Sequence, residues 1–289
     1  MSTTEPVVFA NQTPSGTLIE YSPAPKRWYR VDGAQVPSVT EVLGVLDKPA
    51  LPWWGMKVGV EGTLQLIREG EIGKLDGSPV LTNGGEYHVA LPDTVVALLT
   101  QHKLTVNHVR DKAGDRGTSV HNALEVFLET GKMPDPSMYH DEQAGYVQGL
   151  CGFLFDCPTM LSIESEVMVG SKSHRFAGRF DLLCLIGETE LCTNAKKDIR
   201  ESFPAGRVLF DLKTSSGVYE SHHFQLSAYE LASRECGYPE TDYQAVVRVT
   251  PDGTYEVIRN RSTAEDFLAV KSVYDAIKRF KLGRKKKSD

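Results

Sequence analysis

The spacing of apolar residues predicts helices in the first half of the chain and mostly strands in the second. Between residues 38 and 155, apolar residues recur every three or four positions, as on one face of a helix. Ser38 precedes Glu41 by three residues, which is the capping-box spacing that opens a helix. Residues 1–36 are irregular or β-like in pattern, and glycines and prolines between 70 and 92 indicate a loop or small hairpin. The predicted helices cover residues 38–46, about 54–68, 93–130 and about 140–155.

After Pro158, apolar and polar residues alternate, which is the period of a half-buried strand. A polar insertion, 187–206, interrupts this strand-rich part. The predicted elements are strands at 161–169, 175–186 and 207–213, a helix at about 222–236, strands at 243–250 and 255–259, and a helix from 263 to about 282. This order predicts an α/β fold with a mixed central sheet flanked by helices. We expect an α-rich N-terminal part over 1–110, a core over 111–277 and a basic tail over 278–289.

Composition and charge narrow the classes of protein that fit the chain. Hydrophobic residues make up 40% of the 289 residues, enough for a large core, which excludes a disordered chain. The net charge is −6, which excludes a uniformly basic coat for nucleic acid. Basic residues nevertheless gather between Lys278 and Lys287, in a tail that is either simply solvated or available to phosphates.

Cysteine spacing and hydropathy bear on the cellular compartment. The five cysteines form no Cys-x-x-Cys pair, so we expect reduced thiols rather than a zinc ribbon. No apolar run reaches the roughly 20 residues that span a bilayer, and the first residues lack the pattern of a signal peptide. The sequence therefore predicts a cytoplasmic protein without membrane contact.

Candidate chemistry is concentrated in two predicted strands. Asp211 and Lys213 are two residues apart in a strand, so both project to one face of the sheet. A carboxylate can bind a divalent metal, and a neighbouring lysine can orient or deprotonate a water. Asp181, in the preceding strand, adds a second acid, and Gly178 leaves room there for a backbone or a ligand. Two acids and a lysine form the minimal set for metal-assisted phosphodiester hydrolysis, although an Asp-x-Lys pair is common on surface strands and Asp181 could instead pair with Arg179.

The arrangement of Asp181 followed by Asp211-Leu212-Lys213 resembles the PD-(D/E)XK nuclease signature, in its RecB-like and phage exonuclease branch. Upstream, the segment Arg116–Glu125 is similar to the helical G-x-x-x-H motif of that branch. Downstream, Gln225-Leu226-Ser227-Ala228-Tyr229 resembles its Q-x-x-x-Y helix, whose two polar residues share a helix face. The early segment Pro37–Thr40 with Trp53-Trp54 is similar to the start of phage exonucleases, so the resemblance spans about residues 36 to 230.

The resemblance assigns a role to each matching residue. The implied ligands of Mg²⁺ or Mn²⁺ are His121, Asp181, Asp211 and the main-chain carbonyl of Leu212. Lys213 would position the attacking water or stabilise the developing charge, and Glu166 matches a further acidic position of the branch.

The resemblance also implies contacts with DNA and bears on cofactors. Gln225 and Tyr229 would lie near DNA and the catalytic lysine, or would simply cover the sheet, and Lys285 and Lys286 of the tail are candidate phosphate contacts. No cysteine cluster follows Cys236, so we expect no iron–sulfur cluster. No GxxxxGK[ST] motif is present, so we expect no bound nucleotide and no helicase motor.

These observations favour a metal-dependent exonuclease that hydrolyses DNA from its ends in phage-type recombination, replication or repair. The alternatives are a structure-specific or nicking endonuclease with the same site, and an inactive module that binds DNA or protein. A zinc hydrolase is less favoured, because the remaining histidines lack HExxH-type spacing. The candidate partners are DNA, a single-strand annealing or recombinase protein and a second copy of the chain, in the host cytoplasm if a phage encodes the protein.

Overall fold

The chain divides into two compact units. The computed structural model describes residues 7–285, except 24–26, 47, 49, 76–77, 84–85 and 90–91. One unit comprises Met1–Leu46 together with Gly117–Asp289, and the other comprises Asp47–Arg116. The N-terminal part expected over 1–110 thus contributes residues to both units.

A five-stranded mixed sheet forms the centre of the larger unit, in the order β14-β13-β12-β9-β8. Its strands are β8 (Leu161–Ser171), β9 (Phe176–Ile186), β12 (Gly206–Lys213), β13 (Tyr243–Val249) and β14 (Tyr255–Arg259). β12 pairs with β13 in parallel and with β9 antiparallel, and the other two pairings are also antiparallel. The predicted α/β fold with a mixed sheet is therefore confirmed.

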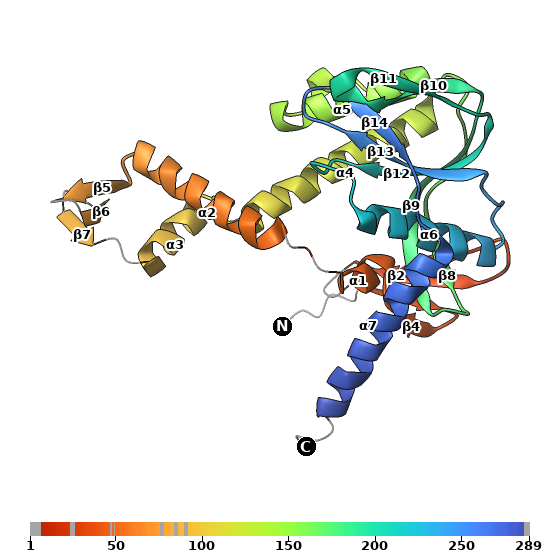
Figure 1. The fold of residues 1–289 in the computed structure, drawn as a ribbon, viewed down its shortest axis with the longest axis horizontal. Coiled ribbons are helices and arrows are strands. Elements are labelled where there is room, and N and C mark those ends of the chain that lie inside the picture. Colours follow the sequence, from red (N-terminus) through yellow and green to blue (C-terminus); the bar gives the residue numbers. More distant parts are fainter. Residues whose placement is uncertain are drawn as a thin grey trace. The chain divides into compact units, whose positions relative to one another are not determined.

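Helices cover both faces of this sheet and bury two hydrophobic clusters against it (Figure 1). On one face lie α5 (Asp141–Asp156) and the end of α4 (Val106–Thr130). On the other face lie α1 (Val39–Leu43), α6 (Glu220–Glu235) and α7 (Ala264–Lys285). The chain passes from β12 through α6 to the parallel strand β13, because two parallel strands must be joined by a crossover connection.

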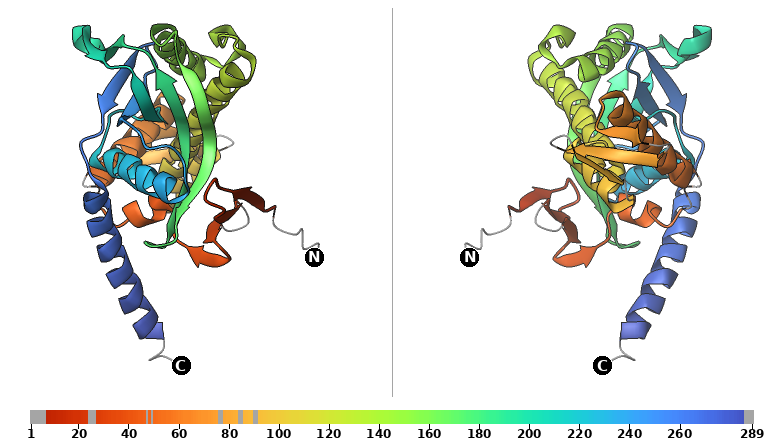
Figure 2. Two further views of the ribbon diagram at one scale, coloured as in Figure 1. Left: turned by 90° about the vertical axis from the view of Figure 1, so that its right-hand side faces the viewer. Right: turned by 90° about the vertical axis from the view of Figure 1, so that its left-hand side faces the viewer.

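The first residues form a four-stranded antiparallel sheet that packs on one end of β8 and β9 (Figure 2). Its strands are β1 (Phe9–Gln12), β2 (Leu18–Ser22), β3 (Trp28–Val31) and β4 (Ala34–Val36). Gly170 of β8 permits the contact, because a Cβ there would lie 2.6 Å from Val31 and 2.8 Å from Ile19. Within the part predicted as irregular or β-like, the described residues from Phe9 to Val36 thus include a small sheet that extends the core.

α1 begins as its sequence predicts, but only half of the expected capping box forms. The Ser38 hydroxyl accepts a hydrogen bond from the Glu41 backbone N–H at 3.0 Å. The Glu41 carboxylate instead accepts hydrogen bonds from Lys278 and from the Tyr274 hydroxyl, both in α7. The Glu41 side chain, which the local motif assigned to the helix cap, therefore makes a tertiary contact with α7 instead.

The polar insertion 187–206 contains a β-hairpin. It comprises β10 (Thr189–Asn194), a 3₁₀ turn (Ala195–Lys197) and β11 (Ile199–Phe203). Leu191 and Phe203 are fully buried in the cluster that also contains α5. The hairpin therefore belongs to the hydrophobic core.

The smaller unit is built from α2 (Ala50–Arg68), α3 (Pro92–Gln101), the first turns of α4 and a three-stranded antiparallel sheet. That sheet, β5 (Ile72–Leu75), β6 (Ser78–Asn83) and β7 (Glu86–Val89), occupies the stretch predicted as a loop or small hairpin. The predicted helix over 93–130 is two helices, because Lys103 adopts a left-handed φ of 57° that ends α3.

Two sequence expectations concern membranes and thiols. Among the described residues, every helix is too short or too polar to cross a bilayer. All five cysteines are buried free thiols.

Candidate metal and hydrolytic site

The central strand β12 carries an ion pair between two candidate residues. Oδ2 of Asp211 lies 2.6 Å from Nζ of Lys213, and the Asp211 side chain is 1% exposed. In the described part of the chain, neither Asp211 carboxylate oxygen has a hydrogen-bond partner beyond this ion pair. A buried carboxylate with unused acceptor capacity is costly unless another cation or donor joins it.

The electrostatics of this pair determine which group carries a proton. Burial raises the pKa of Asp211 to about 6, and the Asp181 carboxylate adds to this rise while the Lys213 ammonium opposes it. Burial alone would lower the pKa of Lys213, but the carboxylates of Asp211 and Asp181 raise it above its ordinary value. Lys213 is therefore a cation at neutral pH and is poorly suited to act as a general base.

Asp181 lies next to Asp211 on the adjacent strand and ties the two strands together. The β9–β12 pairing ends with Phe210 opposite Leu182, so the next positions along are Asp211 and Asp181. There the Asp181 Oδ2 accepts the backbone N–H of Leu212 at 2.7 Å. The Asp181 side chain thus replaces the regular backbone pairing at this point and fixes Leu212, which lies between Asp211 and Lys213.

A second group of side chains surrounds Asp181 from the other elements. Nδ1 of His121, on α4, lies 2.9 Å from Glu166 Oε1 and 3.7 Å from Asp181 Oδ1. One ligand atom from each of these three residues lies within 4.8 Å of the other two. Arg179 pairs with the outer oxygen of the Glu166 carboxylate, with its Nε 2.8 Å from Oε2. An imidazole and two carboxylates at this spacing could hold one divalent cation.

The charges of this group are mutually balanced. Burial alone would lower the pKa of His121, but the nearby carboxylates of Asp181 and Glu166 raise it to about 9. Burial would raise the pKa of Glu166, but His121 and Arg179 hold it below its ordinary value. The imidazolium of His121 therefore supplies the positive charge that offsets the two carboxylates.

The backbone is distorted where Glu166 faces Asp181. Glu166 has a φ of 52°, a left-handed conformation that non-glycine residues seldom adopt within a strand. Its neighbours Ser165 and Val167 pair with Leu182 and Phe180, so Glu166 stands opposite Asp181 without regular pairing. Such strain tends to collect at functional sites, where the surrounding fold maintains it.

A cavity of about 370 Å³ opens beside this group. It is lined by Gly117, Thr118, His121, Asn122, Glu125, Glu166 and Arg179. The helical G-x-x-x-H spacing accounts for one wall, since Gly117 and His121 lie on one face of α4. Arg179 contributes a positive charge to the lining and pairs with Glu166, not with Asp181 as the sequence alternative had it. Its position two residues before Asp181 in the same strand was the signal available.

The two residues of the Q-x-x-x-Y segment contact each other on α6. Gln225 Nε2 donates to the Tyr229 hydroxyl at 2.8 Å, and Tyr229 is only 4% exposed. The Tyr229 ring fills the space beside Gly178, where a Cβ would lie 2.5 Å from ring carbon Cε1. The room that Gly178 leaves is thus taken by a side chain of the protein, and Tyr229 belongs to the core.

The remaining predicted residues are only partly placed. The structure brings Glu166 into the group with His121 and Asp181, whereas Asp211 pairs with Lys213 beside it. Lys286 and the side chain of Lys285 lie outside the described residues.

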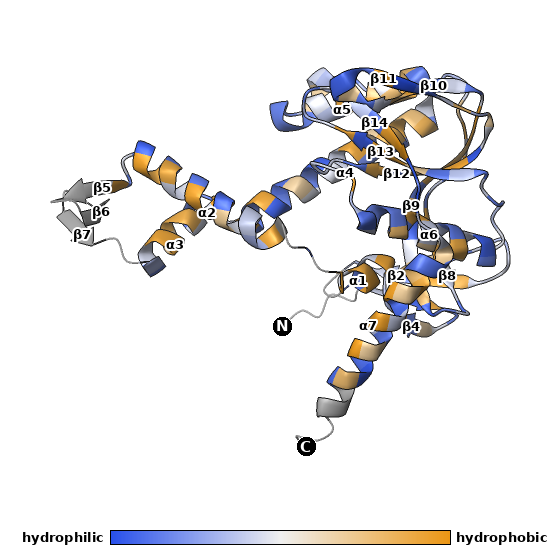
Figure 3. Cartoon of the chain, in the orientation of Figure 1, coloured by the Kyte–Doolittle hydropathy of each residue, from blue (hydrophilic) through white to orange (hydrophobic). Residues whose placement is uncertain are grey.

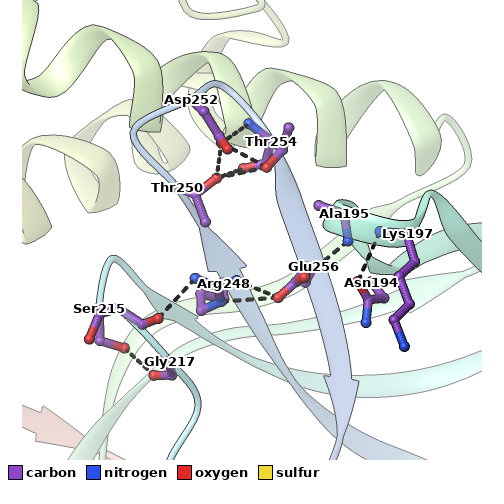
Figure 4. Close-up of polar contacts among 11 residues, drawn as sticks. Asn194, Ala195, Lys197, Ser215, Gly217, Arg248, Thr250, Asp252, Thr254 and Glu256 are labelled. Atoms are coloured by element: carbon purple, nitrogen blue, oxygen red, sulfur yellow. Dashed lines mark hydrogen bonds and ion pairs between the residues drawn. The ribbon is translucent and has the colours of Figure 1, made fainter.

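A polar network fixes the loop that follows Lys213 (Figure 4). Arg248 stands beside Lys213 in the parallel register of β12 and β13 and donates through Nη1 to the carbonyl of Ser216 at 3.3 Å. Its Nε and Nη2 both reach Oε2 of Glu256 on β14. Glu256 also accepts the backbone N–H of Ala195, in the turn of the β10–β11 hairpin. The insertion is thereby linked to the loop next to the candidate site.

Neither the known family models nor the curated proteins include a match for the chain.

Proposed function

We propose that the protein is a metal-dependent DNA exonuclease of the PD-(D/E)XK superfamily with a restriction-endonuclease-like core. One observation carries the proposal: the Asp211–Lys213 pair of the central strand lies beside a group of His121, Glu166 and Asp181 whose donor atoms could hold one cation. The sheet with helices on both faces agrees with such a core. Acids, an imidazole and a lysine converging from different elements are typical of metal-assisted phosphodiester hydrolysis.

The donor set fits Mg²⁺ or Mn²⁺. His121, Glu166 and Asp181 would hold the ion, and Asp211 has buried oxygen acceptors available beside them. When bound, such an ion makes a bound water more acidic and neutralises charge on a phosphate. Carboxylate oxygens are ligands that suit Mg²⁺ and Mn²⁺, and they form the majority of this donor set.

The residues of the chain have separate roles in this proposal. Lys213, protonated and 20% exposed, would orient the attacking water and stabilise the charge that develops on the phosphate. Asp181 keeps Lys213 and Asp211 in place through the N–H of Leu212. Arg179 is half exposed at the cavity, where it can meet a phosphate of the DNA strand.

Digestion of matched linear and covalently closed double-stranded DNA, with Mg²⁺, Mn²⁺ or EDTA, tests the function. Metal-dependent loss of the linear DNA alone, absent in Asp211→Asn, is the expected result. Cleavage of closed circles would instead identify an endonuclease. Binding without cleavage of either substrate would identify a binding module and contradict the proposal.

Metal binding can be measured without DNA. We expect His121→Ala and Glu166→Gln each to weaken Mn²⁺ binding by about 10- to 100-fold in calorimetric titration, since each removes or weakens one ligand. His174→Ala, at a partly exposed histidine that lies near Glu235 and outside this group, is the control and should bind as the wild type does. Unchanged affinity in both site variants would place the ion elsewhere.

The Arg248 network predicts an effect on turnover rather than on binding. Arg248→Ala frees the Ser216 carbonyl and should misplace the loop after Lys213, lowering kcat by about 10- to 100-fold with little change in KM. Glu256→Gln is the matched variant: it keeps Arg248 and its bond to Ser216, so the loss should be smaller. An equal fall in kcat for both, accompanied by equal loss of thermal stability, would indicate a purely structural network.

A further inference from the structure

Helix α2 carries two apolar faces, and its own unit buries only one of them. On the inner face, Val58 and Leu66 are buried, and Gly62 lies against Leu99 and Leu104 of the same unit. The outer face consists of large apolar side chains that are each 45% to 67% exposed, and Figure 3 shows apolar residues along the helix. They are Trp53, Met56, Val60, Leu64 and Ile67. Helices that are apolar on both faces are normally covered on both.

The outer face of α2 has a symmetric spacing. Met56 and Leu64 lie four residues on either side of Val60, and Trp53 and Ile67 lie seven residues on either side. The steps of three and four residues average 3.5, which is the repeat of a helix–helix seam. Because the apolar positions are spaced symmetrically about Val60, the stripe can pack against the same stripe of a second copy that runs antiparallel. An isologous interface has this property, since both subunits contribute the same surface.

Charge along the edge of this face is complementary in the same arrangement. At 100° per residue, Lys57 and Glu61 lie on one edge of the stripe, where they form an i,i+4 ion pair at 3.6 Å and are each 62% exposed. A twofold axis at Val60 places the Lys57–Glu61 edge of one helix beside the same edge of the other. Lys57 of one copy then lies about 3 Å from Glu61 of the other, measured along the helix axes. The opposite edge carries Gly59, where a Cβ would meet nothing within 4 Å, which leaves room for a second helix to approach.

We propose that the outer face of α2 binds the same face of a second copy of the chain, antiparallel and centred on Val60, to form a homodimer. The stripe is about 21 Å long. One helix pair buries less than the roughly 1,200 Å² of a standard interface, so dissociation on the order of 1–10 µM is expected.

Sedimentation equilibrium measures this association directly. The wild type is expected to pass from monomer to dimer as its concentration rises to about 100 µM, and Val60→Asp to remain monomeric. Val96→Asp is the matched control, because Val96 is equally exposed but lies on α3, outside the stripe. A wild type that stays monomeric at about 100 µM would overturn the proposal.

Disulfide crosslinking tests the antiparallel register. All five native cysteines are buried, so an introduced surface thiol has no exposed competitor. Val60→Cys should crosslink to itself, since the proposed axis passes through this position. Met56→Cys should crosslink only when mixed with Leu64→Cys, because in an antiparallel pair two copies of residue 56 lie about 12 Å apart.

The other outcomes contradict the proposal in distinct ways. Met56→Cys that crosslinks efficiently to itself would show a parallel pair. A monomeric Val60→Cys variant whose introduced thiol resists a thiol reagent would show that the same chain covers this face. Neither result depends on whether the protein cleaves DNA, so the dimer and the proposed function can fail separately.

Discussion

Lys213→Ala is expected to lower DNA cleavage by about 10²- to 10³-fold, the scale of losing one positioned group that stabilises a transition state. Lys213 is the ammonium adjacent to the buried Asp211 and retains its proton at neutral pH. The fold should survive, because the pKa of Asp211 is already raised to about 6 and rises further when the ammonium is removed. The carboxyl can then become neutral, which avoids an unpaired buried charge.

Single-turnover cleavage of linear DNA at saturating enzyme measures this effect. Lys172→Ala, at an exposed lysine paired with Asp32, is the control and should cleave at the wild-type rate. Mn²⁺ binding by Lys213→Ala should persist, since His121, Glu166 and Asp181 are unchanged. Cleavage by Lys213→Ala within a few-fold of the wild type would remove Lys213 from the proposed site.

Gly149→Ala is expected to destabilise the larger unit by about 2–3 kcal/mol, the usual cost of an added methyl group in a tightly packed position. α5 faces the turn between β13 and β14 through glycines, and a Cβ at Gly149 would lie 2.4 Å from the carbonyl oxygen of Thr254. That oxygen is fixed, because it accepts the backbone N–H and the hydroxyl of Thr250. The helix must therefore move away from the sheet.

Urea denaturation followed by circular dichroism measures the change in the free energy of unfolding. Gly114→Ala, in the part of α4 that belongs to the smaller unit, is the control for an added methyl group without close contacts, since a Cβ there would meet nothing within 4 Å. Alanine at an open helical position should stabilise by up to about 1 kcal/mol. Equal midpoints for Gly149→Ala and the wild type would show that α5 does not pack on this turn.

The candidate site could be predicted in part because its motifs are local. Period-two alternation placed Asp211 and Lys213 on one face of a strand, and the structure pairs them at 2.6 Å. The resemblance to a helical G-x-x-x-H motif placed Gly117 and His121 in one helix, and both line the cavity. The resemblance named Glu166 with His121 and Asp181, but local spacing could not give their contacts, because the three residues come from different elements. Glu166 reaches His121 from a left-handed backbone position in β8.

Glycines illustrate the same limit. The sequence marked Gly178 as a point of close approach, but only the fold shows that the ring of Tyr229 occupies the space. Gly145 and Gly149 read as poor helix formers within an otherwise regular helix. In the structure they are the positions at which α5 meets the carbonyls of Pro251 and Thr254.

By itself, the sequence determined the α/β class, the order of most helices and strands, and the strand that carries Asp211 and Lys213. These features follow from residue periodicity and capping, which act over a few neighbouring residues. Only the tertiary structure decided that Glu41 binds α7, that 187–206 is a core hairpin, and that His121, Glu166 and Asp181 converge. Those outcomes depend on contacts between residues far apart in the chain, whose energies no local pattern records.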